Sequence, residues 1–164
     1  MTAVDMQSAR LEEFVAAARR ALPDSRLDRY RVRSFGRNAA LAAELIALIA
    51  RGEKTGTFSL AAEFEARPED APRVGDAYVV THFDGTPALI YRITETQTLP
   101  FAAIAPCHVE VEGPRLRELA AWRRVHRDYW TPMLRSIGRE LGDDTPVIFQ
   151  RFRVLFGAGA TDPG

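Results

Sequence analysis

The chain has 164 residues, of which 46% are hydrophobic and 27% are charged, and its formal net charge is zero. This length fits one domain, or one domain with an appendage, and the zero net charge argues against a strong, uniform nucleic-acid footprint. The single cysteine, Cys107, excludes an internal disulfide and a zinc site built from several cysteines.

The N-terminal part of the chain is predicted to form two helices. From Asp5 to Leu22 apolar residues recur at helical spacing, and Pro23 ends the pattern. Charges occur throughout this segment, and no apolar run approaches the length of about 18 residues that spans a membrane. We therefore expect a cytoplasmic protein that contacts no membrane, with residues 1–28 as a helical appendage. After a polar, Arg-rich connection, a second helix is predicted over Ala40–Arg51, with Gly52 as its C-terminal cap.

The middle of the chain is predicted to form strands. A short alternating strand covers Thr57–Leu60, and the acidic, proline-containing stretch Glu63–Arg73 is predicted to be a surface loop. Strands are expected over Ala77–His82 and Ala88–Thr94, joined by an Asp-Gly hairpin turn. A tight hairpin makes this pair antiparallel, which argues against a parallel, doubly wound sheet.

The C-terminal part adds helices and one more strand. A helix is predicted to start at Pro114, and a second helical segment to follow Pro132. Val147–Phe156 is the closing strand, and the tail 158–164 is predicted to be disordered. This order of elements predicts an α+β domain over residues 29–157, with a small, mostly antiparallel sheet curled into a barrel.

Charge is segregated along the chain. Seven arginines face two aspartates between Arg19 and Arg37, a balance of +5, and seven arginines face two acids between Arg115 and Arg139, again +5. Between Ala61 and Asp84 six acids face two arginines, a balance of −4. Two readings stay open: the basic segments meet and form a phosphate-binding face, or they are solvated helix faces.

Aromatic residues lie among the arginines of the second basic segment. Helical spacing places Trp122 and Tyr129 on the apolar stripe, so we expect them in the core. Trp130 and Arg127 are the candidates to line a ligand cleft, by stacking and by phosphate contact. His126 is expected to be a surface residue.

Lysine occurs once in the chain, at Lys54, against 21 arginines. It follows the end of a predicted helix in the sequence RGEKTGT. An arginine stays charged at any accessible pH, whereas a partly desolvated lysine can lose its proton near neutrality and act as a base. Three readings remain open: a catalytic lysine, a ligand or phosphate contact, and a structural lysine in a turn.

Four stretches, in this order and spacing, resemble the ASCH family (ASC-1 homology), part of a PUA-like β-barrel superfamily associated with RNA. They cover roughly Ser34–Phe156 and read SFGRNAALAAELIALIARG leading into GEKTGT, then RVGDAYVV, VEGPRLRELAAWRRVHRDYW and DTPVIFQRFRVLF. The resemblance implies an α+β fold: a small PUA-like, mostly antiparallel β-barrel with flanking helices.

Family members often carry the pattern GxKxxExR. This chain keeps Gly52 and Lys54 but has Thr57 and Ser59 at the last two positions, which resembles a bacterial branch with a GxKTxT motif. Small bacterial relatives are described as amidohydrolases of N4-acetylcytidine that use a Lys, Thr and Glu triad, and other relatives as RNA-binding or ribonucleolytic. The fold alone does not decide between these activities.

The resemblance assigns the triad to Lys54, Thr57 and Glu112. The glutamate follows from the pattern HVEVE, in which Glu110 is the alternative. A threonine hydroxyl is a poor nucleophile unless a neighbour takes its proton, and Lys54 is near enough in sequence to do so. Glu112 precedes the Gly-Pro helix start and is expected to orient the ammonium or to pass a proton to a leaving amine.

Three functional readings follow. The first is a domain that binds RNA or a modified nucleoside in a cleft beside the motif, with Gly52, Thr55, Ser59 and Phe35 as further ligand contacts. The alternative is an amidohydrolase that deacylates nucleosides of the N4-acetylcytidine type. The third is a protein-interaction or regulatory module that binds its partner through the first helix. No spacing of acids or histidines is typical of a metal site, and no cofactor is expected.

Overall fold

The computed structural model describes residues 2–157, and the predicted disordered tail lies outside them. The described chain forms two compact units: unit 1 comprises residues 2–52, 75–93 and 153–157, and unit 2 comprises residues 53–74 and 94–152. The long strands β4 (Pro87–Pro100) and β5 (Pro146–Gly157) contribute residues to both units. The predicted division into an appendage, 1–28, and a domain, 29–157, stays a prediction.

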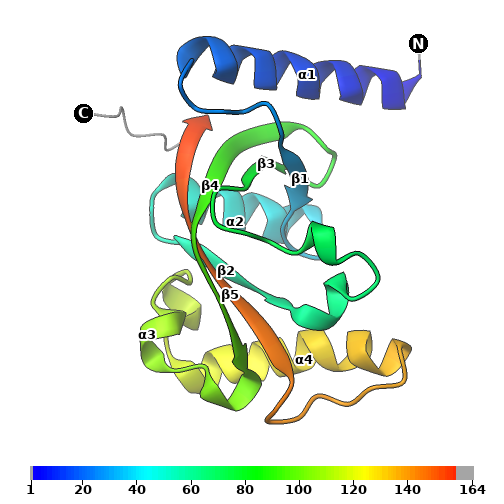
Figure 1. Cartoon of the computed structure of the whole chain (residues 1–164), viewed down its shortest axis with the longest axis vertical. Coiled ribbons are helices and arrows are strands. Elements are labelled where there is room, and N and C mark those ends of the chain that lie inside the picture. The colour runs from blue at the N-terminus through cyan, green and yellow to red at the C-terminus, as the bar shows by residue number, and fades with distance from the viewer. Residues whose placement is uncertain (1, 158–164) are drawn as a thin grey trace. The chain divides into compact units, whose positions relative to one another are not determined.

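Unit 1 contains helix α1 (Ala3–Ala21) and strands β1 (Arg31–Ser34) and β3 (Ala77–Thr81), shown in blue to green in Figure 1. The Thr2 side chain accepts a hydrogen bond from the Asp5 N–H and the Asp5 carboxylate accepts one from the Thr2 N–H, a capping box that starts α1. One face of α1 is buried in a cluster with strands β3 and β4. The fully buried members of this cluster are Val15, Ala18, Leu27, Ala77, Val79 and Ile90.

The second helix ends where the sequence predicts. Helix α2 (Ala39–Ala50) begins after Asn38, whose side chain accepts a hydrogen bond from the Leu41 N–H. Gly52 has a φ of +72°, in the left-handed region that favours glycine, and its N–H donates to the Ile49 carbonyl. The helix therefore stops at Ala50, and Gly52 turns the chain two residues before Lys54.

Unit 2 contains strand β2 (Gly56–Leu60) and helices α3 (Pro106–Val109) and α4 (Leu119–Ser136). Figure 1 shows α4 running alongside β2 and β5. Their facing side chains form one apolar cluster that includes Phe58, Trp122 and Phe149. Short 3-10 helices complete the connections at Ala61–Phe64, Pro68–Asp70, Phe101–Ala103 and Pro114–Leu116. Within residues 2–157, no helix combines the length and the apolar character that a membrane span requires.

The strands are hydrogen-bonded in the order β1-β3-β4-β5-β2. Strands β3 and β4 pair antiparallel, as do β2 and β5, whereas β1 and β3 pair parallel. In the β2–β5 ladder Thr57 lies opposite Gln150 and Phe58 opposite Phe149. The predicted α+β class is confirmed, and the sheet is mixed because β1 joins it in parallel.

Three predictions about elements were wrong. The Arg-rich stretch that contains β1 was expected to be a connection. The helix expected at Pro114 is a 3-10 turn there, and the α-helix starts after Glu118, whose carboxylate accepts from the N–H groups of Ala120 and Ala121. Instead of two helical segments, α4 runs through Pro132 to Ser136. The proline lies on an exposed position, where solvent can replace the one backbone hydrogen bond that its missing N–H removes.

Candidate functional site

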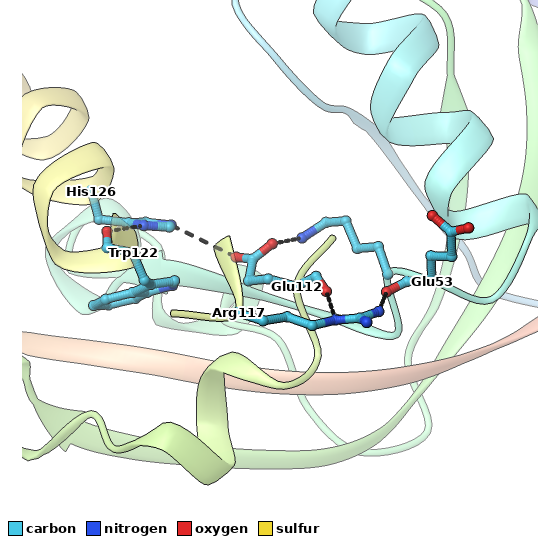
Figure 2. Close-up of polar contacts among 6 residues, drawn as sticks. Glu53, Glu112, Arg117, Trp122 and His126 are labelled. Carbon is cyan, nitrogen blue, oxygen red and sulfur yellow. Dashed lines mark hydrogen bonds and ion pairs between the residues drawn. The ribbon is translucent and has the colours of Figure 1, made fainter. Parts of the chain in front are cut away.

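The lysine at position 54 lies in a buried ion pair within unit 2. Its Nζ is 2.6 Å from Oε2 of Glu112, and the two side chains are 4% and 5% exposed. Lys54 precedes β2, and Glu112 lies in the turn that follows α3. Figure 2 shows the Glu112 carboxylate with contacts on both oxygens. Removing two charges from water is costly, and apolar residues of similar volume often stabilise a fold as well, so stability alone does not account for this pair.

One guanidinium group ties together the two turns that carry the pair. Arg117 Nε donates to the Glu112 carbonyl at 2.9 Å, and a terminal nitrogen of Arg117 donates to the Glu53 carbonyl at 2.6 Å. Figure 2 shows this fork beside the carboxylate. The Thr55 N–H also donates to the Val111 carbonyl at 2.8 Å. The two turns are therefore held together by backbone hydrogen bonds at or next to Lys54 and Glu112, in addition to the ion pair itself.

Gly56 allows the two turns to approach closely. A Cβ atom at this position would lie 2.3 Å from the Gln150 carbonyl oxygen and 2.8 Å from Val111 side-chain atoms. These distances are far inside van der Waals contact, so any side chain would push the Lys54 turn away from β5 and from the segment before Glu112. The second glycine of GEKTGT is thus required for packing.

His126 faces the other oxygen of Glu112. Its Nε2 is 3.9 Å from Glu112 Oε1, and its Nδ1 is 2.9 Å from the Trp122 carbonyl oxygen. The prediction that His126 is a surface residue was wrong, since its side chain is 13% exposed. The ring stacks on the Trp122 indole at a centroid distance of 4.2 Å, one helical turn earlier on α4. Spacing of four residues from a buried tryptophan was the sequence signal for this placement.

Burial lowers the pKa of His126, and the nearby Lys54 ammonium lowers it further. The Glu112 carboxylate and the hydrogen bond to the Trp122 carbonyl act in the opposite direction without reversing the shift. His126 is therefore uncharged at neutral pH. Because a carbonyl oxygen can only accept, Nδ1 carries the proton and Nε2 presents a lone pair to Glu112.

The predicted hydroxyl residues lie on β2. Thr57 is 6% and Ser59 is 3% exposed, and Gln150 of β5 donates to the Ser59 hydroxyl at 3.0 Å. Thr55 is exposed and is anchored through its backbone, because its carbonyl accepts from the Phe152 N–H. Between the two candidate acids, Glu112 is buried whereas Glu110 is exposed. The structure thus brings Lys54 and Glu112 together, while a contact between Lys54 and Thr57 stays a prediction.

The other predicted ligand contacts are more scattered. Phe35 is 7% exposed and packs near Tyr91 within unit 1, with the Arg33 guanidinium over its ring. Arg127 is exposed on α4, and its guanidinium lies 5.3 Å from the centre of the Phe101 ring. Gly52 is exposed at the end of α2.

The expected positions of two aromatic rings on α4 were wrong. Trp130 is 1% exposed and packs edge-on against Trp122 and Phe101, so its ring offers no free face for stacking on a ligand. Tyr129, which was expected in the core, is 43% exposed. The assignment followed the spacing of seven residues between Trp122 and Tyr129, whereas the buried stripe of α4 runs through Trp122, His126 and Trp130 at a spacing of four.

The site combines an ammonium, a carboxylate and a neutral imidazole in one line. Such a set can move protons, because the Lys54 ammonium donates to Glu112 and the imidazole of His126 presents a further acceptor beside the carboxylate. Within residues 2–157, no three histidine, cysteine, aspartate or glutamate side chains gather as a metal site requires. The ammonium at Oε2 would also repel a cation bound by Glu112.

The chain was compared with known families and structures. The family model described as the ASCH domain matches residues 31–156. The chain is similar to the crystal structure of an ASCH domain from Lactobacillus crispatus JV V101, with 25% identity, a TM-score of 0.78, and coverage of 92% of this chain and 94% of that one. It shares the fold of protein EF3133 from Enterococcus faecalis V583, with 20% identity, a TM-score of 0.78, and coverage of 89% and 88%. No curated protein matches it.

These matches test the resemblance predicted from the four sequence stretches. The matched residues, 31–156, include the whole range Ser34–Phe156 over which those stretches were found. Assignment to a bacterial branch with the GxKTxT motif stays a prediction. The family and the fold are confirmed by the model match and the structural likeness: the chain belongs to the ASCH domain family.

Proposed function

We propose that this protein is an amidohydrolase that removes an acyl group from the exocyclic amine of a pyrimidine nucleoside of the N4-acetylcytidine type. The observation that carries the proposal is the buried pair of Lys54 and Glu112 at 2.6 Å. A direct phosphate contact fits Lys54 poorly, because its side chain is 4% exposed and its charge is already matched by Glu112. The triad implied by the family resemblance supplies the chemistry.

In this proposal Thr57 is the nucleophile. A proton that moves from Lys54 Nζ to Glu112 Oε2 leaves a neutral amine and a neutral acid, so the buried pair gains no net charge. The amine takes the hydroxyl proton as Thr57 Oγ1 attacks the acyl carbon. The C–N bond then breaks, and Glu112 gives its proton to the leaving nitrogen. The free amino nucleoside departs and an acyl ester remains on Thr57, which water hydrolyses.

The test is release of acetate and cytidine from N4-acetylcytidine by the full chain. We expect Lys54→Arg and Thr57→Val each to lower kcat by at least about 10²-fold, since arginine cannot give up its proton and valine has no hydroxyl. Thr94→Val is the matched control, because Thr94 is an exposed threonine on β4. Unchanged hydrolysis by Lys54→Arg would remove the lysine from the mechanism, and absence of hydrolysis by the wild type would refute the proposal.

A second candidate function is RNA binding without hydrolysis. It is favoured by the exposed side chains of Arg124, Arg127 and Tyr129 on α4, which combine positive charge with an aromatic ring. If these arginines contact phosphates, affinity for single-stranded RNA should fall steeply with added salt, and each Arg→Gln change should reduce the slope of log K against log salt by about 1. Affinity that is independent of salt would contradict this candidate.

A further inference from the structure

The imidazole of His126 is fixed in position and in tautomer. Its ring is stacked on Trp122 at an angle of 22° and meets the rings of Phe58 and Trp130 edge-on, at centroid distances of 5.8 Å and 4.7 Å. The hydrogen bond from Nδ1–H to the Trp122 carbonyl removes the remaining rotation. Nε2 therefore points toward Glu112 with its lone pair, as Figure 2 shows.

Nε2 of His126 and Oε1 of Glu112 form a pair of acceptors. Their separation of 3.9 Å is too long for a hydrogen bond, and neither atom carries a proton while the imidazole is neutral and Glu112 is paired with Lys54. A donor atom at about 2.9 Å from both would see them at an angle of about 85°. A water molecule, with two hydrogens on one oxygen, matches this arrangement.

We infer that His126 is the general base of the water step, accepting at Nε2 a proton from a water molecule whose other hydrogen is bound by Glu112 Oε1. This inference rests on the proposed function. The water oxygen bonds to the acyl carbon of the Thr57 ester as its proton passes to Nε2. The bond between that carbon and Thr57 Oγ1 then breaks, and the imidazolium returns the proton to Oγ1. The products are the carboxylic acid and the free hydroxyl group.

The surroundings of His126 favour a neutral imidazole in the resting enzyme and can stabilise the imidazolium that forms during the water step. The charged groups that act on it are Glu112 and Lys54, and its ring neighbours Trp122, Phe58 and Trp130 are uncharged. Burial disfavours the imidazolium at rest, whereas the Glu112 carboxylate stabilises it when it forms. Lys54 serves the first step and His126 the second, so the two bases share one carboxylate.

The experiment compares the wild type with His126→Gln and His126→Phe, which keep polarity and ring packing respectively. Asp128→Asn, an exposed change on the same helix, is the control. With N4-acetylcytidine we expect both His126 variants to release about one equivalent of cytidine and then slow by about 10²-fold or more. Mass spectrometry should find one acetyl group on Thr57. The wild-type rate should fall as pH drops through the His126 pKa, which burial holds below its usual value, and this acid limb should be absent in the variants.

The outcomes separate this inference from the proposed function. If the wild type turns over and both His126 variants match it without an acetyl adduct, the base role is wrong and the amidohydrolase proposal stands. If the wild type does not turn over, the proposed function fails and the base role falls with it. Nitrogen NMR adds a readout that needs no activity: a proton on Nε2 rather than Nδ1 at neutral pH would overturn the inference, and Glu112→Gln should lower the His126 pKa further.

Discussion

Two ion pairs of unit 2 have nearly the same length and opposite surroundings. Lys54 and Glu112 are 2.6 Å apart with side chains 4% and 5% exposed. Arg139 contacts Glu65 through two nitrogens, each 2.7 Å from a carboxylate oxygen, with side chains 49% and 55% exposed. By geometry the second pair is the better one, because it is bidentate. The buried pair is nevertheless the stronger one, because water and salt screen the exposed charges and leave the buried charges unscreened.

The contrast separates a pair that contributes to solubility from a pair that constrains the interior. The hydrogen bond from Arg139 lowers the pKa of Glu65, yet each of the two charges would be well solvated alone. Neither Lys54 nor Glu112 can exchange its partner for bulk water in the folded state. The variants below alter the buried pair, the residues around it, or the exposed pair.

The largest effect is expected when the buried pair is broken. Lys54→Met or Glu112→Leu alone leaves one charge without its partner, and we expect each to lower the free energy of unfolding by about 3–5 kcal/mol. Urea denaturation followed by circular dichroism measures this. The double change Lys54→Met with Glu112→Leu should recover much of the loss, because no unpaired charge remains. A double variant no more stable than the single ones would show that the pair holds the fold by its geometry.

A smaller effect is expected at Arg117, which fixes the turns around the pair. Arg117→Ala removes two hydrogen bonds to carbonyls but leaves the ion pair, so a stability loss of about 1 kcal/mol is expected. We expect kcat to fall by a larger factor than this loss of stability corresponds to, because the turns that position Lys54 and Glu112 would no longer be fixed to each other. Arg124→Ala, an exposed change on α4, is the control for stability. If Arg117→Lys matches the wild type in kcat, the fork geometry is irrelevant.

The pH dependence of stability should reveal His126. Burial holds its folded pKa below the usual value of 6.5, so as pH falls the unfolded chain binds this proton first. The contribution is complete above pH 6.5 and is lost as pH falls from there toward the folded pKa. Unfolding free energies measured from pH 7.5 downward should therefore decline less in His126→Phe than in the wild type. Equal slopes in both proteins would contradict the burial of a neutral imidazole.

The smallest effect is expected at the exposed pair. Arg139→Gln should change the melting temperature little, and any change should shrink further in high salt, because both charges are open to solvent. Thermal melts of this variant at low and high salt, beside those of Lys54→Met, compare the two environments directly. A loss at Arg139 as large as the loss at Lys54 would remove the distinction between the pairs.

The ion pair could be predicted from the sequence because its signals are chemical. A single lysine in an arginine-rich chain, and the motif shared with the ASCH family, pointed to Lys54 and Glu112 before any geometry was available. The choice between Glu112 and Glu110 could not be made from the pattern HVEVE. It depends on the short helix α3, which ends before these residues and turns Glu112 inward and Glu110 outward.

His126 and β1 were missed for the same reason. Both lie among arginines, and charge density was taken as a sign of exposure. The stems and neighbours of charged residues can cover apolar surface, so an arginine-rich stretch can still contribute a half-buried strand or a buried ring. The continuation of α4 through Pro132 was not predicted because proline usually ends a helix. At this exposed position it removes one backbone hydrogen bond and the helix continues.

Because Gly56 leaves no space for a Cβ atom, neighbouring positions of the motif around Lys54 differ in which substitutions they can accept. Thr55 beside it is exposed and accepts substitution without a steric conflict, whereas every residue other than glycine at position 56 must move the lysine to fit. A library that retunes substrate preference should vary position 55 and keep position 56 constant. A selection in which other residues survive at position 56 would mean that the two turns can separate without loss of folding.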